Sequence, residues 1–343
     1  MATSATHRWR RKTWVTCLFG LPLALSAGGQ QTPPAYDKQT KEALNKGIEA
    51  NQTGKYADAI KAFKEANKIQ RNACFDCYMG LAIAYRDEGD ARSAEENVSK
   101  AVGIAADAHE RALAHTLKGT VLMSFAAGDA KKLALAEAEC RQALTEEKEY
   151  LSARYRLGVV LLMEKRDEEG SKELNAFLSV APIGGYAEEA RKLIANPKRA
   201  RERFAPEFEV TTLQGEKMAL SRLPGKIVVL DFWATWCAPC RAALPEIKDL
   251  LKKYPREKLI LISISGDADE KAWKEYVAKK GMDWPQCRDK NDQLGRLFGV
   301  RSIPTFMVID GEGIIRQVIR GENPWQSVAY RLRDTLKSLK ELE

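Results

Sequence analysis

The feature that most constrains the fold is a nearly continuous apolar run at residues 226–234, which a Trp-Cys-Ala-Pro-Cys sequence at residues 236–240 follows almost at once. A strand with a solvated face would alternate apolar and polar residues. The unbroken run therefore predicts a central strand, buried on both faces, in a parallel or mixed sheet. The two cysteines are then expected to begin the following helix.

A helix start would make these cysteines reactive. The first turn of a helix presents unpaired backbone N–H groups and the positive end of the dipole, which stabilise a thiolate and lower its pKa. Cys237 is therefore the expected nucleophile. Cys240 lies one turn later, within bridging distance, and can resolve a mixed disulfide on Cys237. Pro239 suits a first helical turn, where its missing N–H is no loss.

The first 29 residues have the three parts of a secretory signal. A basic start precedes an apolar stretch at residues 14–25, and small residues follow at 26–29. The apolar stretch is shorter than the ~20 residues of a spanning helix, which favours a cleaved signal over a retained anchor. We expect export to a periplasmic or other extracytoplasmic compartment, with tethering to the inner membrane if the signal is not cleaved.

The formal net charge of +8 does not indicate a nucleic-acid partner. Four Lys and Arg residues and no acid lie within the first twelve positions, inside the expected signal. The remaining basic residues are interspersed with acidic ones on expected helix faces, which is typical of a solvated surface.

Residues 40–202 follow a polar linker at 30–39 and read as a series of Ala-rich helices. Small and aromatic residues recur there with a period of roughly 34 residues. The marks of the first two units are Leu44, Gly47, Gly54, Tyr56, Ala59, Phe63, Ala66, Leu81, Ala82, Tyr85, Gly89, Ala94, Val98 and Ala101. The pattern resembles tetratricopeptide repeats, which implies an all-α solenoid of antiparallel helix pairs with a capping helix at its end. The fourth unit has Gly170 where alanine is usual, so its second helix is expected to be less regular.

A solenoid of this kind usually offers a concave surface to a peptide or protein. We expect this one to hold a client or a redox partner. The alternative is a spacer or self-association module, because fold-level analogy identifies no ligand.

A second Cys-x-x-Cys, formed by Cys74 and Cys77, lies at the turn before the second repeat unit. No buried strand precedes it, so a structural disulfide or two unreactive thiols are favoured over a second redox centre. A zinc site shared with residues 236–240 is disfavoured, because the two pairs are far apart in the chain. We expect no metal and no cofactor, and we expect Cys140 and Cys287 to be small buried hydrophobic residues.

Residues 203–343 form the second expected domain, in which strands alternate with helices. The expected strands are 207–210, 217–220, 226–234, 259–264, 306–309 and 314–320, and the expected helices are 239–253, 270–280, 293–298 and 325–342. This alternation implies an α/β sheet with helices on both faces.

Three features of this domain occur together: Phe-Trp-Ala-Thr-Trp-Cys-Ala-Pro-Cys-Arg at 232–241, Ser-Ile-Pro-Thr at 302–305, and an extra strand and helix between 267 and 289. They resemble the TlpA/ResA-like branch of thioredoxins. The resemblance implies a multidomain chain in which the all-α repeat solenoid precedes an α/β thioredoxin-like fold with an extra strand and helix.

The same resemblance implies roles for individual residues. Cys237 attacks and Cys240 resolves. The peptide between Ile303 and Pro304 is cis and packs beside the disulfide, where the backbone of Ile303 would hydrogen-bond a substrate strand. Trp236 is expected at the exposed rim of the disulfide, as a further substrate-binding residue.

Asp231 is the next informative residue, because it is an acid within the apolar run. Burial would raise its pKa, which suits a proton acceptor for Cys240, and its position coincides with the buried aspartate of ordinary thioredoxins. The alternative is a carboxylate that is satisfied at a sheet margin. Many ResA-like proteins instead keep a glutamate three positions after the second cysteine, where this sequence has Ala243.

These features together predict an exported thiol-disulfide oxidoreductase that reduces client proteins through Cys237 and Cys240. Its expected partners are protein disulfide or dithiol clients and, by resemblance, a membrane thiol-electron donor. A peroxiredoxin-like peroxidase is disfavoured, because Thr235 lies two residues before Cys237 where the peroxidatic pattern has Thr or Ser three before, and Leu230 replaces an expected proline. The other alternative is a repeat scaffold with a non-catalytic thioredoxin domain, against which the intact cysteine pair argues.

Overall fold

The computed structural model describes residues 36–321 and 327–339. The chain divides into two compact units between Arg201 and Glu202. The predicted signal at 1–29 and residues 30–35 of the predicted linker lie outside the described residues. Within the described ranges, no helix is both long enough and apolar enough to cross a membrane.

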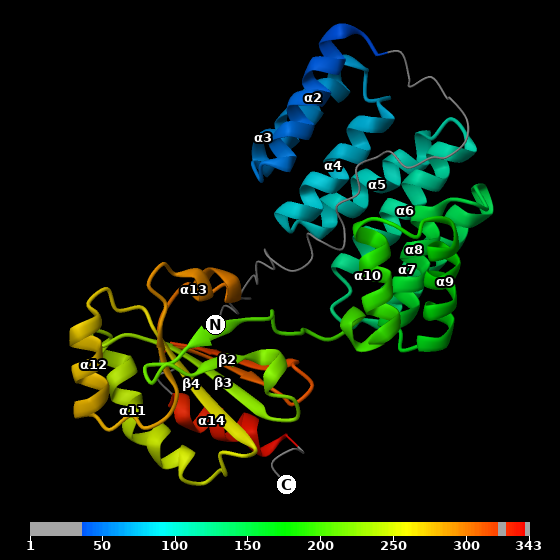
Figure 1. Ribbon diagram of the computed structural model, residues 1–343. Coiled ribbons are helices and arrows are strands. Elements are labelled where there is room, and N and C mark those ends of the chain that lie inside the picture. The colour runs from blue at the N-terminus through cyan, green and yellow to red at the C-terminus, as the bar shows by residue number, and fades with distance from the viewer. Residues whose placement is uncertain (1–35, 322–326, 340–343) are drawn as a thin grey trace, which may run out of the picture. The chain divides into compact units, whose positions relative to one another are not determined.

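The N-terminal unit is a stack of helices joined by short turns (Figure 1). Each long helix packs mainly on the next one in the chain. The helices are α2 (Lys38–Gln52), α3 (Tyr56–Ile69), α4 (Phe75–Glu88), α5 (Ala91–Ile104), α6 (Ala108–Ser124), α7 (Ala130–Glu146), α8 (Leu151–Met163), α9 (Asp167–Val180), α10 (Gly185–Ala195) and the 3-10 helix η1 (Pro197–Ala200). The predicted all-α repeat architecture is confirmed. Helix α2 begins inside the predicted linker, because the Asp37 side chain caps it by accepting a hydrogen bond from the backbone N–H of Thr40.

The expectation of a less regular helix at Gly170 is wrong. Helix α9 runs without interruption from Asp167 to Val180. A Cβ atom at Gly170 would lie 2.5 Å from Cδ2 of Leu162 and 2.8 Å from the carbonyl oxygen of Gly158. Glycine is therefore the residue that lets α9 approach α8 this closely, and it supports the packing of the last repeat unit.

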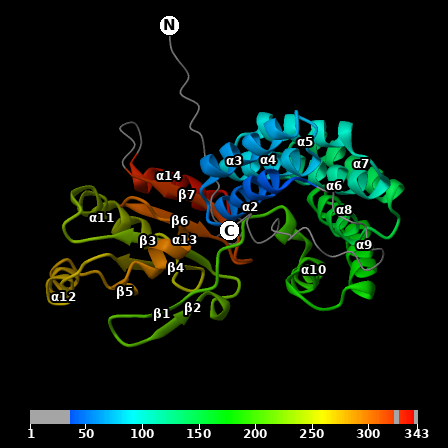
Figure 2. The same cartoon turned by 90° about the horizontal axis from the view of Figure 1, so that it is seen from above.

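The C-terminal unit is built on a five-stranded mixed sheet with the strand order β5-β4-β3-β6-β7, which can be followed in Figure 2. Its strands are β3 (Ile227–Trp233), β4 (Leu259–Ser265), β5 (Gln286–Arg288), β6 (Thr305–Ile309) and β7 (Ile315–Arg320). A separate antiparallel pair is formed by β1 (Glu209–Thr211) and β2 (Lys217–Ala219). The helices are η2 (Leu220–Arg222), α11 (Ala238–Leu251), α12 (Glu270–Lys279), α13 (Gln293–Phe298) and α14 (Val328–Lys337). The predicted α/β thioredoxin-like fold is confirmed.

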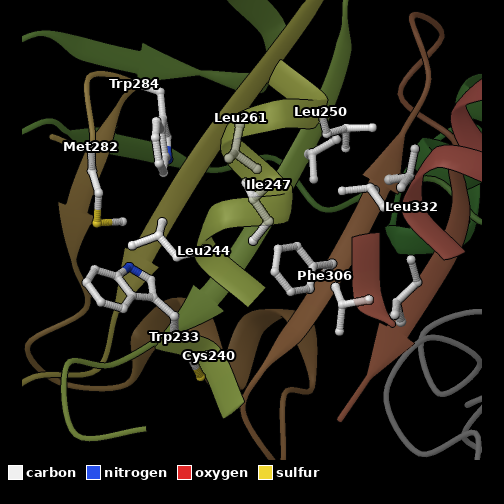
Figure 3. Close-up of a cluster of buried hydrophobic side chains, with 14 of the residues drawn as sticks. Trp233, Cys240, Leu244, Ile247, Leu250, Leu261, Met282, Trp284, Phe306 and Leu332 are labelled. Atoms are coloured by element: carbon white, nitrogen blue, oxygen red, sulfur yellow. The ribbon is translucent and has the colours of Figure 1, made fainter. Parts of the chain in front are cut away.

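Strand β3 is the centre of this sheet, and all seven of its residues are buried. It runs parallel to β4 and antiparallel to β6. Side chains alternate between two apolar clusters, with Val229 and Trp233 on one face and Leu230 and Phe232 on the other. Figure 3 shows the first face, where residues of α11 and α14 cover the sheet. The apolar run thus forms the doubly covered central strand that was predicted.

The C-terminal helix is shorter than the predicted range 325–342. It begins at Val328, because the Ser327 hydroxyl caps it by accepting from the backbone N–H of Tyr330. It ends at Lys337. Trp325 and residues 340–343 lie outside the described part of the chain.

Candidate active site

The Cys237–Cys240 pair lies where the loop after β3 leads into α11. Cys237 is the N-cap of that helix, and its Sγ accepts a hydrogen bond from the backbone N–H of Cys240 at 3.2 Å. The two residues form a disulfide with a Cα–Cα distance of 5.3 Å. Cys237 is 5% exposed and Cys240 is 7% exposed. The helix start therefore puts the sulfur of Cys237 among unpaired N–H groups, an arrangement that stabilises a thiolate.

Asp267 holds the loop that leads into Cys237. Its carboxylate accepts the backbone N–H of Thr235 at 2.9 Å, the hydroxyl of Thr235 at 2.7 Å and the hydroxyl of Ser265 at 2.6 Å. The adjacent Trp236 is 68% exposed. The exposed indole of Trp236 therefore lies directly before the disulfide, on a loop that hydrogen bonds to Asp267 hold in place.

Sequence reasoning missed Asp267. A signal for it existed, because Asp267 comes shortly after the expected strand 259–264. Carboxyl ends of parallel neighbouring strands meet at one edge of a sheet, so a polar residue after β4 is placed near the loop after β3.

The Ile303–Pro304 peptide is cis, as the resemblance implies. Strand β6 begins at the next residue, Thr305, which is paired with Phe232 near the end of β3. The cis peptide therefore lies at the edge of the sheet where β3 ends and the loop to Cys237 begins. Across residues 36–321 and 327–339, the backbone N–H and C=O of Ile303 have no hydrogen-bond partner.

Asp231 sits within the sheet and is 4% exposed. It is flanked by Ser263 on β4 and by Phe306 on β6, so the alternative of a carboxylate at a sheet margin is wrong. Burial raises the pKa of Asp231 to about 7, and the hydrogen bond that Ser263 donates at 2.8 Å lowers it in part. The carboxyl group can therefore change its charge near neutral pH, on the sheet face that also carries Cys237 and Cys240.

The Cys74–Cys77 pair is also a disulfide, with an S–S distance of 1.98 Å. Both residues are 0% exposed and pack in the apolar cluster between α2, α3 and α4. Cys140 and Cys287 are free and buried, and burial raises the pKa of each thiol to about 12. In the part of the chain that the structure describes, no group of three or more His, Cys, Asp or Glu side chains could hold a metal ion.

Comparison with known proteins places this site in a family. Residues 202–318 match the AhpC/TSA family. The thiol-disulfide oxidoreductase ResA of Bacillus thuringiensis subsp. konkukian (strain 97-27) is 36% identical over 129 residues, which are 38% of this chain and 75% of that protein. The thioredoxin-like protein YneN of Bacillus subtilis (strain 168) is 35% identical over 117 residues, which are 33% of this chain and 68% of that protein.

A solved structure, the thioredoxin-family thiol:disulfide interchange protein of Chlorobium tepidum TLS, is 28% identical and matches with a TM-score of 0.36. The match covers 40% of this chain and 97% of that chain. The relatives named above align with about a third of the present sequence. On the identity and coverage of the ResA match, the chain belongs to the ResA-like thiol-disulfide oxidoreductases of the thioredoxin fold.

Proposed function

We propose that the protein is exported and reduces disulfide bonds of client proteins through Cys237 and Cys240. The observation that carries the proposal is the position of Cys237 at the N-cap of α11, beside the exposed Trp236. The thiolate of Cys237 attacks one sulfur of the client disulfide, and the other client sulfur leaves with the electron pair. Cys240 then loses its proton and attacks Sγ of Cys237, which releases the second client thiolate. Two electrons pass to the client and the Cys237–Cys240 disulfide forms.

Asp231 is the proton acceptor for Cys240 in this proposal. A carboxyl group whose pKa is about 7 is partly ionised at neutral pH and can both take up and release a proton there. Ala243 occupies the position at which many ResA-like proteins keep a glutamate, so that residue cannot take over the role.

Trp236, Ile303 and Pro304 form the proposed client-binding rim. An extended client segment can pair with the unpartnered backbone groups of Ile303, as an added strand pairs with a sheet edge. The exposed ring of Trp236, directly before Cys237, offers a further apolar contact.

The N-terminal unit, with predicted bounds 40–202, is proposed to be a tetratricopeptide-type domain that binds a client or redox partner. The proposed thioredoxin-like domain covers 203–343. Cys74–Cys77 is proposed as a structural disulfide, because neither sulfur is accessible. Two disulfides in one chain suit an oxidising, extracytoplasmic compartment, where a membrane thiol-electron donor would return the electrons.

The test is reduction of insulin disulfides by the pre-reduced full-length protein. Activity should be lost in Cys237→Ser, and Cys240→Ser should accumulate a mixed disulfide with the client. Cys287→Ala removes a buried free thiol and serves as the matched control, with activity close to that of the wild type. Retention of activity in Cys237→Ser would refute both the reductase and its assignment to this pair, and would favour a scaffold with a non-catalytic domain.

A peroxidase is the less favoured enzyme. The hydroxyl and the backbone N–H of Thr235 are both bound to Asp267, which leaves Thr235 committed to the loop structure. Purified protein should therefore not consume hydrogen peroxide faster than its Cys237→Ser variant does.

A further inference from the structure

A chain of two buried hydrogen bonds ends on Asp231. The indole Nε1–H of Trp284 donates to Oγ of Ser263 at 2.9 Å, and the hydroxyl of Ser263 donates to Oδ2 of Asp231 at 2.8 Å. All three residues are buried. Asp231 and Ser263 are register partners on β3 and β4, and Trp284 precedes β5. Figure 3 shows Trp284 in the same cluster as Trp233 and Cys240.

The direction of these two bonds follows from the chemistry of the groups. An indole nitrogen can only donate, so Ser263 must accept from Trp284. A serine hydroxyl has a single proton, and the geometry directs that proton to Oδ2 of Asp231. While Ser263 donates to Oδ2 in this way, Oδ2 is an acceptor, and Oδ1 is the oxygen left to carry the proton of the neutral acid. Within the described residues, Oδ1 is buried and has no hydrogen-bond partner.

We propose that Trp284 and Ser263 are positioning residues that fix the orientation of the Asp231 carboxyl group, so that Oδ1 is the atom that takes the proton from Cys240. The S–H bond of Cys240 breaks, its proton passes to Oδ1, and the electron pair stays on the sulfur that attacks Cys237. The inference rests on the proposed role of Asp231. It gives the segment between 267 and 289 a part in the reaction, because that segment supplies Trp284.

Few other groups can titrate beside Asp231. Its neighbours on β4 and β6 are Ser263 and Phe306, which do not titrate in this range. The start of helix α11 contributes the thiols of Cys237 and Cys240 to the same cluster, and the buried residues that α12 and α14 contribute to it are apolar or aromatic: Trp273, Val277, Val328, Leu332 and Leu336. The phenols of Tyr254 and Tyr276 also pack against the cluster, but a phenol titrates near pH 10, and burial raises the pKa of Tyr276 further. A pH dependence of the reaction near neutrality can therefore be assigned to Asp231 and the two thiols.

Infrared difference spectroscopy tests the orientation without using activity. Spectra of the oxidised full-length protein at about pH 5 and about pH 9 lie on either side of the Asp231 pKa. The C=O stretch of protonated Asp231 should be absent from Asp231→Asn. It should move to higher frequency in Ser263→Ala, because the carbonyl oxygen Oδ2 loses its donor. An unchanged frequency in Ser263→Ala would mean that the proton sits on Oδ2, and it would overturn the proposal.

The rate at which Cys240 releases a client from the mixed disulfide, measured against pH by rapid quench, tests the consequence. Ser263→Ala should raise the midpoint of this profile by about one pH unit, because the carboxylate loses a hydrogen bond. Trp284→Phe should raise it by less, because Ser263 can then rotate and accept from the neutral acid. Trp273→Phe is the matched control: it removes a buried indole N–H of the same cluster that has no partner among the described residues, and its profile should not move.

Failure of this inference and failure of the proposed function look different. If Asp231→Asn leaves the profile unchanged, Asp231 is not the proton acceptor and the proposed function fails at that point. If Asp231→Asn alters the profile while Ser263→Ala and Trp284→Phe leave its midpoint in place, only the positioning role is wrong. If Trp284→Phe does not fold, the infrared spectrum and the pH profile of Ser263→Ala still test the proposal.

Discussion

The two Cys-x-x-Cys pairs are almost the same local structure in two different surroundings. Cys74 and Cys237 are both N-caps of helices. Each Sγ accepts a hydrogen bond from the backbone N–H of the second cysteine, at 3.1 Å for the Cys74 pair and 3.2 Å for the Cys237 pair. The Cα–Cα distances are 5.2 Å and 5.3 Å. The spacing and the helix start therefore determine the geometry of the bond in both places.

The surroundings of the two pairs differ in the exposure of the neighbouring residues and in the presence of a titratable carboxyl group. Cys74 and Cys77 are sealed between helices of the repeat unit, and the backbone N–H of Cys74 is bound to Asn67. Cys237 instead follows a loop with an exposed tryptophan, and its cluster borders a carboxyl group with a raised pKa. A helix start lowers a thiol pKa in either place, but of the two pairs it is Cys237–Cys240 that has an exposed residue directly before it and a carboxyl group with a raised pKa on its sheet face.

The largest expected contrast is in reduction by a small dithiol. Dithiothreitol added to the folded protein should reduce Cys237–Cys240 fully while Cys74–Cys77 stays oxidised, because attack on a disulfide needs access to a sulfur atom. Alkylation followed by peptide mass mapping measures each pair. Equal rates of reduction would break the comparison and reopen Cys74–Cys77 as a redox centre.

Asp231→Asn should slow the reaction and should also remove a loss of stability that the wild type shows as pH rises. Release of the client should slow about a hundredfold at neutral pH, because the variant lacks the proposed general base. In the unfolded chain the pKa of Asp231 is near its ordinary value of 3.8, whereas in the folded protein it is about 7. The folded protein therefore keeps this proton to a higher pH. The wild type therefore loses stability as pH rises from about 4 to about 7, by up to about 4 kcal/mol above that range.

Asn does not ionise, so the variant should lack this decline. Urea unfolding of both oxidised proteins at several pH values measures it. A wild-type decline that persists in the variant would show that another group causes it.

The Cys74→Ala/Cys77→Ala double variant should show the opposite pattern. Closing so short a loop stabilises the repeat unit by about 2 kcal/mol in the chain-entropy account, and the variant should lose this amount in chemical unfolding. Reduction of insulin per folded molecule should stay near the wild-type level. A loss of activity with unchanged stability would contradict a structural role.

Trp236→Ala should have the smallest effect of the four. Loss of an exposed aromatic contact is expected to raise the KM for a protein client about tenfold and to leave kcat nearly unchanged. A small-molecule disulfide, which does not reach the rim, is the matched control substrate. An equal change for both substrates would place Trp236 in the chemistry of the cysteines.

Much of the candidate site is visible in the sequence, because its signals are local. The apolar run predicts β3, the cysteine spacing predicts the helix start, and an acid inside the run predicts the buried Asp231. The error at Gly170 had a different origin. Glycine in place of the usual alanine was expected to make the helix less regular, but it allows a close contact between α8 and α9. Such a contact depends on how two helices cross, and neither helix alone contains that information.

Local periodicity and helix caps thus determined, from the sequence alone, the helical repeats, the central strand and the reactive position of Cys237. The tertiary structure decided that Asp267 ties down the loop before Cys237 and that Trp284 reaches Asp231 through Ser263. The physical reason is that hydrogen bonds between side chains on different strands depend on strand order and register. Those are set by the packing of the whole sheet, so Cys74–Cys77 can share the local geometry of Cys237–Cys240 without its exposed loop or its neighbouring carboxyl group.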